Sequence, residues 1–198
     1  VVLHGTARVI PPTEKVRIRK VNAPQIQLFD PEMRFKELLA LAAGKDAVRC
    51  AVVHPCDTGS LSGAMDSARY GLIVPVLIGP AKRIRFVAAE AGIDLEGVEI
   101  VDVEHSHAAA QKAASMAAHG EVEVIMKGSL HTDEMLKAIL AEPTLRTGRR
   151  MSHVFRFDVP LYPKPLLITD AALNIRPTLA EKVDIIQNAI DFARVMGV

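Results

Sequence analysis

The sequence predicts a doubly wound α/β fold, in which a mostly parallel sheet carries helices on both faces and includes one antiparallel strand. Short apolar runs with the length of buried strands occur at residues 48–53, 73–78, 98–101 and 122–126. Helical segments follow them at residues 60–70, 81–91 and 106–119, and the last begins at Thr132. Because the connections are brief, right-handed parallel crossovers are the expected arrangement.

The segments before and after these alternating strands and helices differ from the parallel crossover pattern. A helix that begins at Pro31 and ends at Gly44 is expected before the first strand. Only residues 160–164 separate the strands predicted at 153–159 and 165–169, which is too short for a parallel crossover, so one of them is antiparallel. The final helix has a capping box at Thr178 and Glu181. Its predicted buried stripe comprises Val183, Ile186, Ile190 and Ala193.

The composition fits one globular domain with a small attachment. The chain has 198 residues, of which 49% are hydrophobic, and this suffices for one complete core. We therefore expect a domain at residues 31–198 and a linker at residues 1–30, where a basic run occupies 15–20. The net charge of +1 and the 4% aromatic content argue against a nucleic-acid partner.

Cysteine usage and hydropathy indicate the compartment. Cys50 and Cys56 are too few for a disulfide scaffold, so a reducing, cytoplasmic location is expected. No apolar run approaches the roughly 18 residues that a membrane span needs, and the first residues are not built like a signal peptide. We expect a soluble protein that makes no membrane contact.

Residues 126–133 are the strongest candidate for the chemistry. A buried strand ends there at Met126. Lys127, Gly128 and Ser129 break the strand and allow the chain to turn, and a helix begins at Thr132, directly after His131. Open α/β sheets bind ligands at this edge, and a lysine can neutralise a phosphate there. The alternative is a structural lysine paired with an acid. Asp133 and Glu134, in the first turn of the helix, oppose anion binding at its N-terminus.

A second loop, at residues 54–60, also joins a strand to a helix and contains Asp57 and Ser60. It either contacts a bound anion or is an ordinary polar turn, because it lacks both the dinucleotide-binding glycine pattern and the Walker lysine. Cys56 in this loop is expected to be inert. His105 and His107 have no third ligand at a recognisable spacing, so a helix-entry loop is favoured over a metal site.

Two polar clusters are expected at the same edge of the sheet. Ser152 and His153 precede a predicted strand, and Asp170 and Asn174 follow another. Because Asp170 and Asn174 end an otherwise apolar strand, they either face a ligand or form a plain turn.

Several collinear motifs together resemble the phosphate acetyl/butyryltransferase family. They occupy residues 126–133, 150–155 and 165–175, with further matches at 53–64 and 184–190, so the resemblance covers roughly residues 33–198. It is strongest to the acyltransferase part of the bifunctional enoyl-CoA hydratase/phosphate acetyltransferases. Residues 3–9 resemble the last strand of their hot-dog hydratase domain. The resemblance implies that residues 1–30 are a remnant strand and linker of that domain and that 31–198 form the N-terminal part of the acyltransferase domain, whose second lobe is missing. It implies that the chain is truncated at both ends.

The resemblance also implies an activity, the reversible transfer of a short acyl group between coenzyme A and phosphate. It implies no metal and no tightly bound cofactor, with coenzyme A as substrate, phosphate or acyl phosphate as the other partner, and a homodimer. Lys127, His131 and Asp170 are the candidate catalytic residues. The candidate substrate-binding residues are Gly128, Ser129, Thr132, Ser152, His153, Asn174, Asp57 and Ser60. The catalytic base is not assigned.

Two other functions are compatible with the sequence. The first is a truncated lobe that binds coenzyme A or dimerises without catalysis. The second is a dinucleotide-dependent dehydrogenase, since the predicted architecture resembles the isopropylmalate dehydrogenase fold. The expected glycine pattern and acid cluster of a dehydrogenase are not visible in the sequence.

Overall fold

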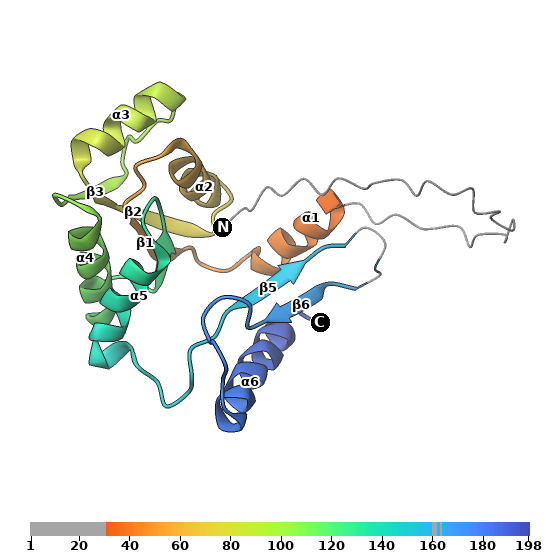
Figure 1. The fold of residues 1–198 in the computed structure, drawn as a ribbon. Helices are drawn as coiled ribbons and strands as arrows, with labels where there is room; N and C mark the ends of the chain where they lie inside the picture. Colours follow the sequence, from red (N-terminus) through yellow and green to blue (C-terminus); the bar gives the residue numbers. More distant parts are fainter. Residues whose placement is uncertain (1–30, 160–161, 163) are drawn as a thin grey trace, which may run out of the picture.

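The computed structural model describes residues 31–159, 162 and 164–198, and its main feature is a four-stranded parallel sheet (Figure 1). The strand order is β3-β2-β1-β4, as successive right-handed crossovers produce. The strands are β1 (Val48–Val53), β2 (Ile73–Gly79), β3 (Glu99–Asp102) and β4 (Val124–Lys127). The helices that connect and follow them are α2 (Thr58–Arg69), α3 (Ala81–Ala91), α4 (Ser106–Ala118) and α5 (Thr132–Ala141). This part, which we call the first lobe, confirms the predicted α/β fold.

The core of the first lobe has two layers because side chains alternate along each strand. Cys50 and Val52 of β1 pack on one face of the sheet together with Leu61 of α2 and Ile84 of α3. The intervening residues of β1 pack on the other face, against α4, where four alanines are buried: Ala109, Ala110, Ala113 and Ala114. The small side chains of α4 allow its backbone to lie close to the sheet.

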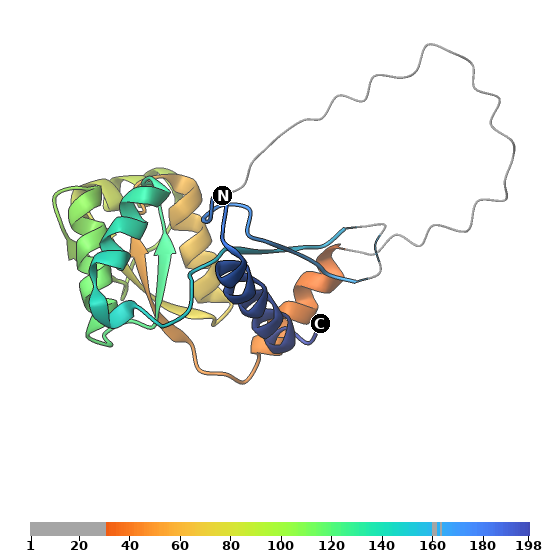
Figure 2. The same ribbon diagram turned by 60° about the horizontal axis from the view of Figure 1, so that its bottom comes forward.

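The second lobe consists of a separate two-stranded sheet and a long helix. β5 (Val154–Phe157) and β6 (Leu166–Thr169) pair antiparallel, and α6 (Leu179–Val195) packs against β6. The antiparallel strand is therefore confirmed, but it pairs in its own hairpin and does not join the parallel sheet. A linker that includes the 3-10 helix Pro143–Leu145 connects the lobes, and Figure 2 shows them as two bodies.

Helix α1 (Pro31–Ala42) precedes the first lobe but contacts both lobes. Arg34 is buried and donates a hydrogen bond of 2.7 Å to the backbone carbonyl of Tyr162, and its guanidinium lies 3.7 Å from Asp158. Phe35 meets the ring of Tyr70, at the end of α2, edge to face with centroids 5.7 Å apart. Helix α1 therefore bridges the two lobes.

Helix α6 begins as predicted, but its buried side is different. The Thr178 hydroxyl accepts from the Glu181 N–H, and the Glu181 carboxylate accepts from the Thr178 N–H, which completes the capping box. The predicted buried stripe is wrong, because Val183, Ile186 and Ile190 are 60%, 55% and 40% exposed. A two-stranded hairpin is too narrow to cover that whole face, so α6 buries Ile185 and leaves the stripe open.

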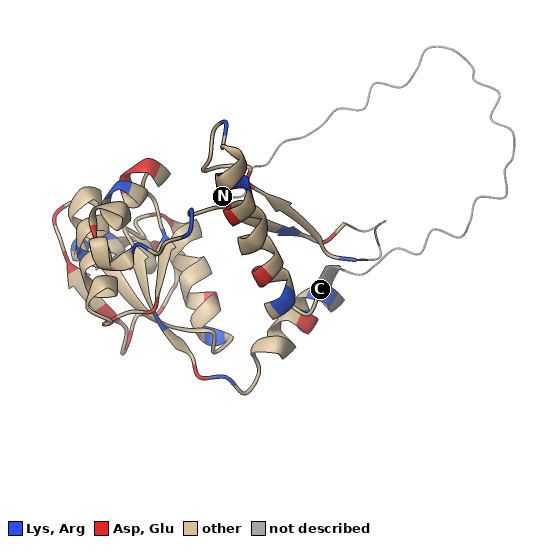
Figure 3. Ribbon diagram, turned by 90° about the horizontal axis from the view of Figure 1, so that it is seen from below, with Lys and Arg blue, Asp and Glu red and all other residues tan. Residues whose placement is uncertain are grey.

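Basic and acidic residues are interspersed along the elements of both lobes (Figure 3). In the part of the chain that the structure describes, no helix is both long and apolar enough to cross a membrane. The predicted remnant strand and linker at residues 1–30 lie outside the described residues.

Candidate active site

Two loops meet at the carboxyl edge of the parallel sheet. β1 and β4 are neighbours with Val53 opposite Lys127, so the loops that leave these strands begin side by side. The Gly128 N–H donates to the Val53 carbonyl and the Ser129 N–H donates to the His54 carbonyl, each at 2.9 Å. The loops therefore continue the ladder of the sheet for two more residues.

The approach of the loops requires glycine at position 128. A Cβ atom there would lie 2.3 Å from the Val53 carbonyl oxygen and 2.7 Å from the His54 carbonyl oxygen. These neighbours are backbone atoms, which cannot rotate away. His54 has a φ of 53°, a left-handed conformation that is uncommon for a residue with a side chain, and its Nδ1 lies 2.9 Å from the Ser129 carbonyl oxygen. The close approach of the two loops therefore depends on glycine at position 128 and on the left-handed conformation of His54.

Ser129 and Asp57 both hold the loop between β1 and α2 in place. The Ser129 hydroxyl donates to the His54 carbonyl at 2.9 Å and accepts from the Cys56 N–H at 3.3 Å. Asp57 is the N-cap of α2 and accepts from the Ser60 N–H at 2.8 Å. Partial burial raises the pKa of Asp57, but hydrogen bonds from Ser60, Gly59 and the Ser129 hydroxyl outweigh this and hold the pKa below its usual value. The structure thus brings Gly128, Ser129, Asp57 and Ser60 together.

Lys127 is a positively charged side chain at the carboxyl edge of the parallel sheet. Its side chain is half-buried, and Nζ lies 3.3 Å from the Gly128 carbonyl oxygen. Within the described residues no carboxylate pairs with it, so the alternative of a structural lysine neutralised by an acid is not what the structure contains. A lysine held by one carbonyl retains two donors and its charge for an anion.

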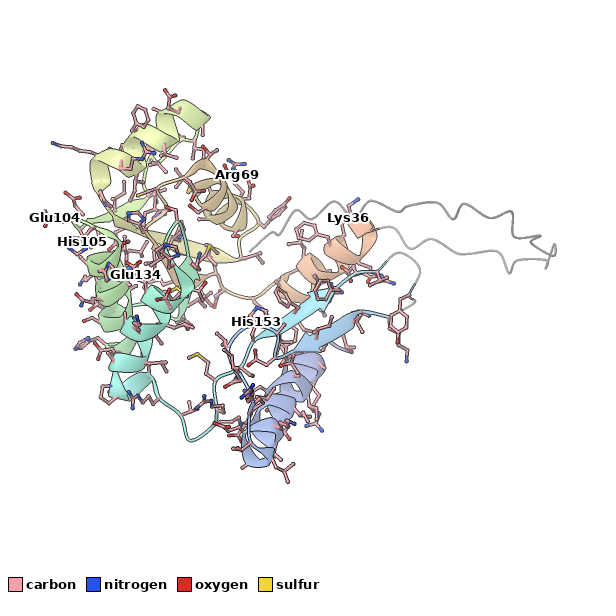
Figure 4. All side chains as sticks on the ribbon, in the orientation of Figure 1. Lys36, Arg69, Glu104, His105, Glu134 and His153 are labelled. Atoms are coloured by element: carbon pink, nitrogen blue, oxygen red, sulfur yellow. The ribbon has the colours of Figure 1, made fainter. Side chains whose placement is uncertain are left out.

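His131 and Thr132 lie at the start of α5. Both are exposed, and the His131 side chain makes no capping hydrogen bond. His131 lines a small cavity with Glu134 and His107, and the His107 Nδ1 lies 2.8 Å from the Glu134 carboxylate. Figure 4 shows Glu134 on α5 near the start of α4.

The remaining sequence candidates of the first lobe have structural roles. The His105 Nδ1 accepts from the Ala108 N–H at 3.1 Å and caps α4, which confirms a helix-entry loop. Burial raises the pKa of Cys50 to about 11 and also raises that of Cys56, where the charge of Arg83 acts in the opposite direction. Both thiols are buried and uncharged near neutral pH, which agrees with the expectation that Cys56 is inert.

A second group of candidates lies in the other lobe. The Asp170 carboxylate accepts from the N–H groups of Ala172 and Leu173, at 3.1 and 3.0 Å, and from the Asn174 amide. Burial raises the pKa of Asp170, but these bonds lower it below its usual value. Asn174 also donates to the Met151 carbonyl at 2.9 Å and accepts from Arg150 at 2.7 Å. The Asp170 carboxylate therefore forms a turn, while Asn174 holds Arg150.

Ser152 and His153 precede β5. The Ser152 hydroxyl accepts from the Asn188 amide of α6 at 2.8 Å, and His153 packs edge to face on Phe155 with centroids 4.0 Å apart. Figure 4 places His153 at the start of β5, away from His105 and Glu134. Among the described residues, no hydrogen bond or ion pair joins this group to the loops of the first lobe. The candidates thus form two groups, and not one.

Ser152 and Asn174 line a cavity of about 1230 Å³ between the lobes. Other residues of this cavity were not predicted from the sequence, among them Arg146, Asp184 and Asn188. Arg146 lies in a linker that shows no recognisable motif. Asp184 and Asn188 are polar residues on an amphipathic helix, where polar residues are expected in any case. Only the cluster of three arginines at 146–150 could have indicated an anion site.

The C-terminal part of the chain matches a known protein family. Residues 107–198 match the family described as phosphate acetyl/butaryl transferase. This segment contains the β4–α5 loop, the linker and the second lobe. The resemblance inferred from the motifs is therefore confirmed.

Individual relatives extend the match toward the N-terminus. A phosphate acetyltransferase of Rickettsia felis is 51% identical over 175 residues, which are 87% of this chain and 49% of the relative. A phosphate butyryltransferase of Clostridium acetobutylicum is 32% identical over 165 residues, 83% of this chain and 55% of the relative. The chain spans about half the length of the curated relatives it matches.

Solved structures show the same fold. A phosphotransacetylase from Streptococcus pyogenes superposes with a TM-score of 0.71 at 16% identity, over 86% of this chain and 60% of that one. A branched-chain phosphotransacylase from Enterococcus faecalis gives a TM-score of 0.58 at 23% identity, over 74% of this chain and 51% of that one. These likenesses support the fold alone.

Proposed function

We propose that the protein transfers a short acyl group between coenzyme A and phosphate, so that acyl-CoA and phosphate give acyl phosphate and free coenzyme A. The sequence relatives support this, because they are named as phosphate acetyltransferases and phosphate butyryltransferases. The structural observation that carries the proposal is Lys127, a half-buried ammonium at the carboxyl edge of the sheet with no carboxylate partner in the described residues.

In the direction of thioester formation, the thiolate sulfur of coenzyme A attacks the carbonyl carbon of the acyl phosphate. The C–S bond forms, the C–O bond to phosphate breaks, and phosphate leaves with the electron pair. The reaction needs a cation for the phosphate, donors for the developing oxyanion and a base for the thiol. Lys127 can supply the cation, and the exposed Thr132 hydroxyl and the free N–H groups of α5 can donate.

The roles of the other candidates follow from their contacts. His131 is exposed at the start of α5 and its side chain makes no capping hydrogen bond, so we assign it to the substrates. Gly128, Ser129, Asp57 and Ser60 act by holding the two loops in register. In the second lobe, Asp170, Asn174, Ser152 and His153 position the loops around the cavity. The proposal includes no metal and no tightly bound cofactor, and it extends to a homodimer in a reducing cytoplasm, which suits two free thiols.

The test is acyl phosphate-dependent acylation of coenzyme A, followed through thioester absorbance with acetyl, propionyl and butyryl phosphate. The longest natural form of the protein is compared with its Lys127→Gln variant and with Lys82→Gln, which removes an exposed lysine of α3. Loss of a preorganised charge typically lowers kcat/KM by about 100-fold or more, so Lys127→Gln should fall by that amount while Lys82→Gln is unchanged.

Two results would count against the proposal. Absence of turnover by the folded wild-type protein with all three acyl phosphates would contradict the reaction itself. Full activity of Lys127→Gln would leave the reaction standing but would remove Lys127 from the site. Binding of coenzyme A without turnover would favour the alternative of a non-catalytic binding lobe.

A further inference from the structure

His54 is held at the carboxyl edge of the parallel sheet by contacts with two neighbouring segments. It directly follows β1, and its N–H donates to the Ile78 carbonyl of β2 at 2.7 Å. Its own carbonyl accepts from the Ser129 N–H and from the Ser129 hydroxyl, each at 2.9 Å. A φ of 53° is unfavourable for a residue with a side chain, so these contacts must impose it. The imidazole therefore leaves the backbone from a fixed position.

The contacts of the imidazole determine which nitrogen carries the proton. Nδ1 lies 2.9 Å from the Ser129 carbonyl oxygen and 3.3 Å from the Ser129 hydroxyl oxygen. A carbonyl oxygen can only accept, and the hydroxyl already donates its hydrogen to the His54 carbonyl, so Nδ1 must be the donor. In the neutral ring, Nε2 then carries the lone pair. The backbone of the second loop thus selects the tautomer of His54.

The Nε2 atom of His54 is open to solvent. Within the described residues it makes no hydrogen bond, and it is not a buried atom. Because Val53 lies opposite Lys127, His54 and Lys127 continue adjacent strands, and such strands lie roughly 4.8 Å apart. A free lone pair therefore lies at the same edge as the ammonium group to which we assign the phosphate.

The other ionisable groups around His54 do not bond to its ring. The charged side chains on the surrounding elements include Asp57 in the same loop, Asp102 at the end of β3 and Arg83 on α3, and the thiol of Cys56 is uncharged. Both carboxylates accept from backbone N–H groups, of Ser60 and Ala81 respectively, each at 2.8 Å. In the part of the chain that the structure describes, none of these groups hydrogen-bonds to the imidazole.

Other candidate bases lack one of these properties. The Asp57 and Asp170 carboxylates already accept from backbone N–H groups and thereby cap a helix and form a turn. His131 is exposed, but its side chain makes no capping hydrogen bond that would fix its orientation or its tautomer. Of these four side chains, His54 is the one that combines an oriented ring with an open acceptor nitrogen.

We propose that the Nε2 atom of His54 is the general base that removes the thiol proton of coenzyme A. The inference rests on the proposed acyl transfer and fills the one task that Lys127 and Thr132 cannot perform. The proton moves from sulfur to Nε2, the thiolate attacks the carbonyl carbon, and the bond from that carbon to the phosphate oxygen breaks. The departing phosphate takes the proton from Nε2 and leaves as hydrogen phosphate. Meanwhile the Ser129 carbonyl stabilises the imidazolium through Nδ1.

The test is the coenzyme A acylation assay with the longest natural form of the protein. In His54→Asn the new side chain tolerates the left-handed conformation, and its amide can donate to the Ser129 carbonyl but cannot take up a proton. General-base catalysis contributes about 100- to 10,000-fold, so kcat/KM near neutral pH should fall by about that factor. His119→Asn is the matched control, because the His119 Nδ1 lies 2.7 Å from the Ser115 carbonyl oxygen at the end of α4. This control should turn over as the wild type does.

The dependence on pH separates a base from a residue that only holds the loops. A free thiol ionises without help at a pKa of about 8.5. The deficit of His54→Asn should therefore shrink by about tenfold or more between about pH 7 and about pH 9. A merely structural role predicts the same deficit at both pH values. In a second variant, His54→Gly, the backbone conformation is unstrained, and added imidazole should restore part of the turnover.

Several results would overturn the assignment. They are wild-type turnover by a folded His54→Asn, a deficit that does not change with pH, and an equal loss in His119→Asn. Failure of imidazole to raise the turnover of a folded His54→Gly would also count against it. If thermal unfolding shows that neither His54 variant folds, the ring is structural and the assignment fails. Absence of turnover by the wild type contradicts the proposed reaction and the base together, whereas an unaffected His54→Asn beside an active wild type removes the base alone.

Discussion

The substitution Gly128→Ala tests the close contact between the two loops at the edge of the sheet. The added Cβ would lie 2.3 Å from the Val53 carbonyl oxygen and 2.7 Å from the His54 carbonyl oxygen, so the backbone must move. Overpacking of this kind costs about 1–3 kcal/mol. The movement also weakens the two loop hydrogen bonds, each at 2.9 Å, at about 0.5–1.5 kcal/mol apiece. The free energy of unfolding should therefore fall by about 2–6 kcal/mol in total.

The assay is urea and thermal unfolding followed by circular dichroism. For a chain of this size 1 kcal/mol shifts Tm by roughly 2–4 °C, so Gly128→Ala should unfold about 4–24 °C below the wild type. The control is Gly63→Ala, because Gly63 is in helix α2, is exposed and has nothing within 4 Å of an added Cβ. This control should be neutral or more stable by about 0.5–1 kcal/mol. Equal stability of the two variants would refute the role of glycine at position 128.

Two further predictions concern helices α2 and α6. Asp57→Ala removes the cap of α2 and should cost about 1 kcal/mol. Because the folded pKa of Asp57 is lowered, its stabilisation is present above the unfolded pKa of about 4 and is lost as the pH falls through the folded pKa. The difference in unfolding free energy between wild type and variant should shrink from about pH 6 to about pH 3, and a constant difference would contradict the assignment. In α6, Ile185→Ala should cost about 2–4 kcal/mol because Ile185 is buried, whereas Ile186→Ala should change stability by less than about 0.5 kcal/mol. Similar costs for the two isoleucines in chemical denaturation would mean that α6 is rotated.

The parallel sheet could be predicted from the sequence because its signals are local. Each apolar run of β1, β2 and β4 is followed by a helix, and short connections leave few alternatives for the topology. The loops after β1 and β4 were also placed correctly at one edge, since adjacent parallel strands end together. The prediction succeeded where neighbours in sequence become neighbours in space.

The second lobe was less predictable because its partners are set by distant contacts. The spacing of Val183, Ile186 and Ile190 indicates an apolar face, but not which element covers it, and α6 instead buries Ile185. Similarly, a polar turn and a ligand site look alike in sequence, and only the bonds of Asp170 to Ala172 and Leu173 reveal the turn. Arg146 carries no motif, and its place in the cavity depends on how the linker crosses between the lobes.

The bridge made by α1 has a consequence for the order of folding. The first lobe is continuous in the chain, so its strands and helices can pair as soon as residues 48–141 have left the ribosome. The bond between Arg34 and Tyr162 joins residues 128 positions apart, and α1 must wait for the hairpin before it is complete. Helix α1 is thus synthesised early but docks only after the hairpin has formed. Loop closure over that distance makes this docking slow relative to the formation of the sheet. The elements therefore pack together in a different order from the one in which they are synthesised.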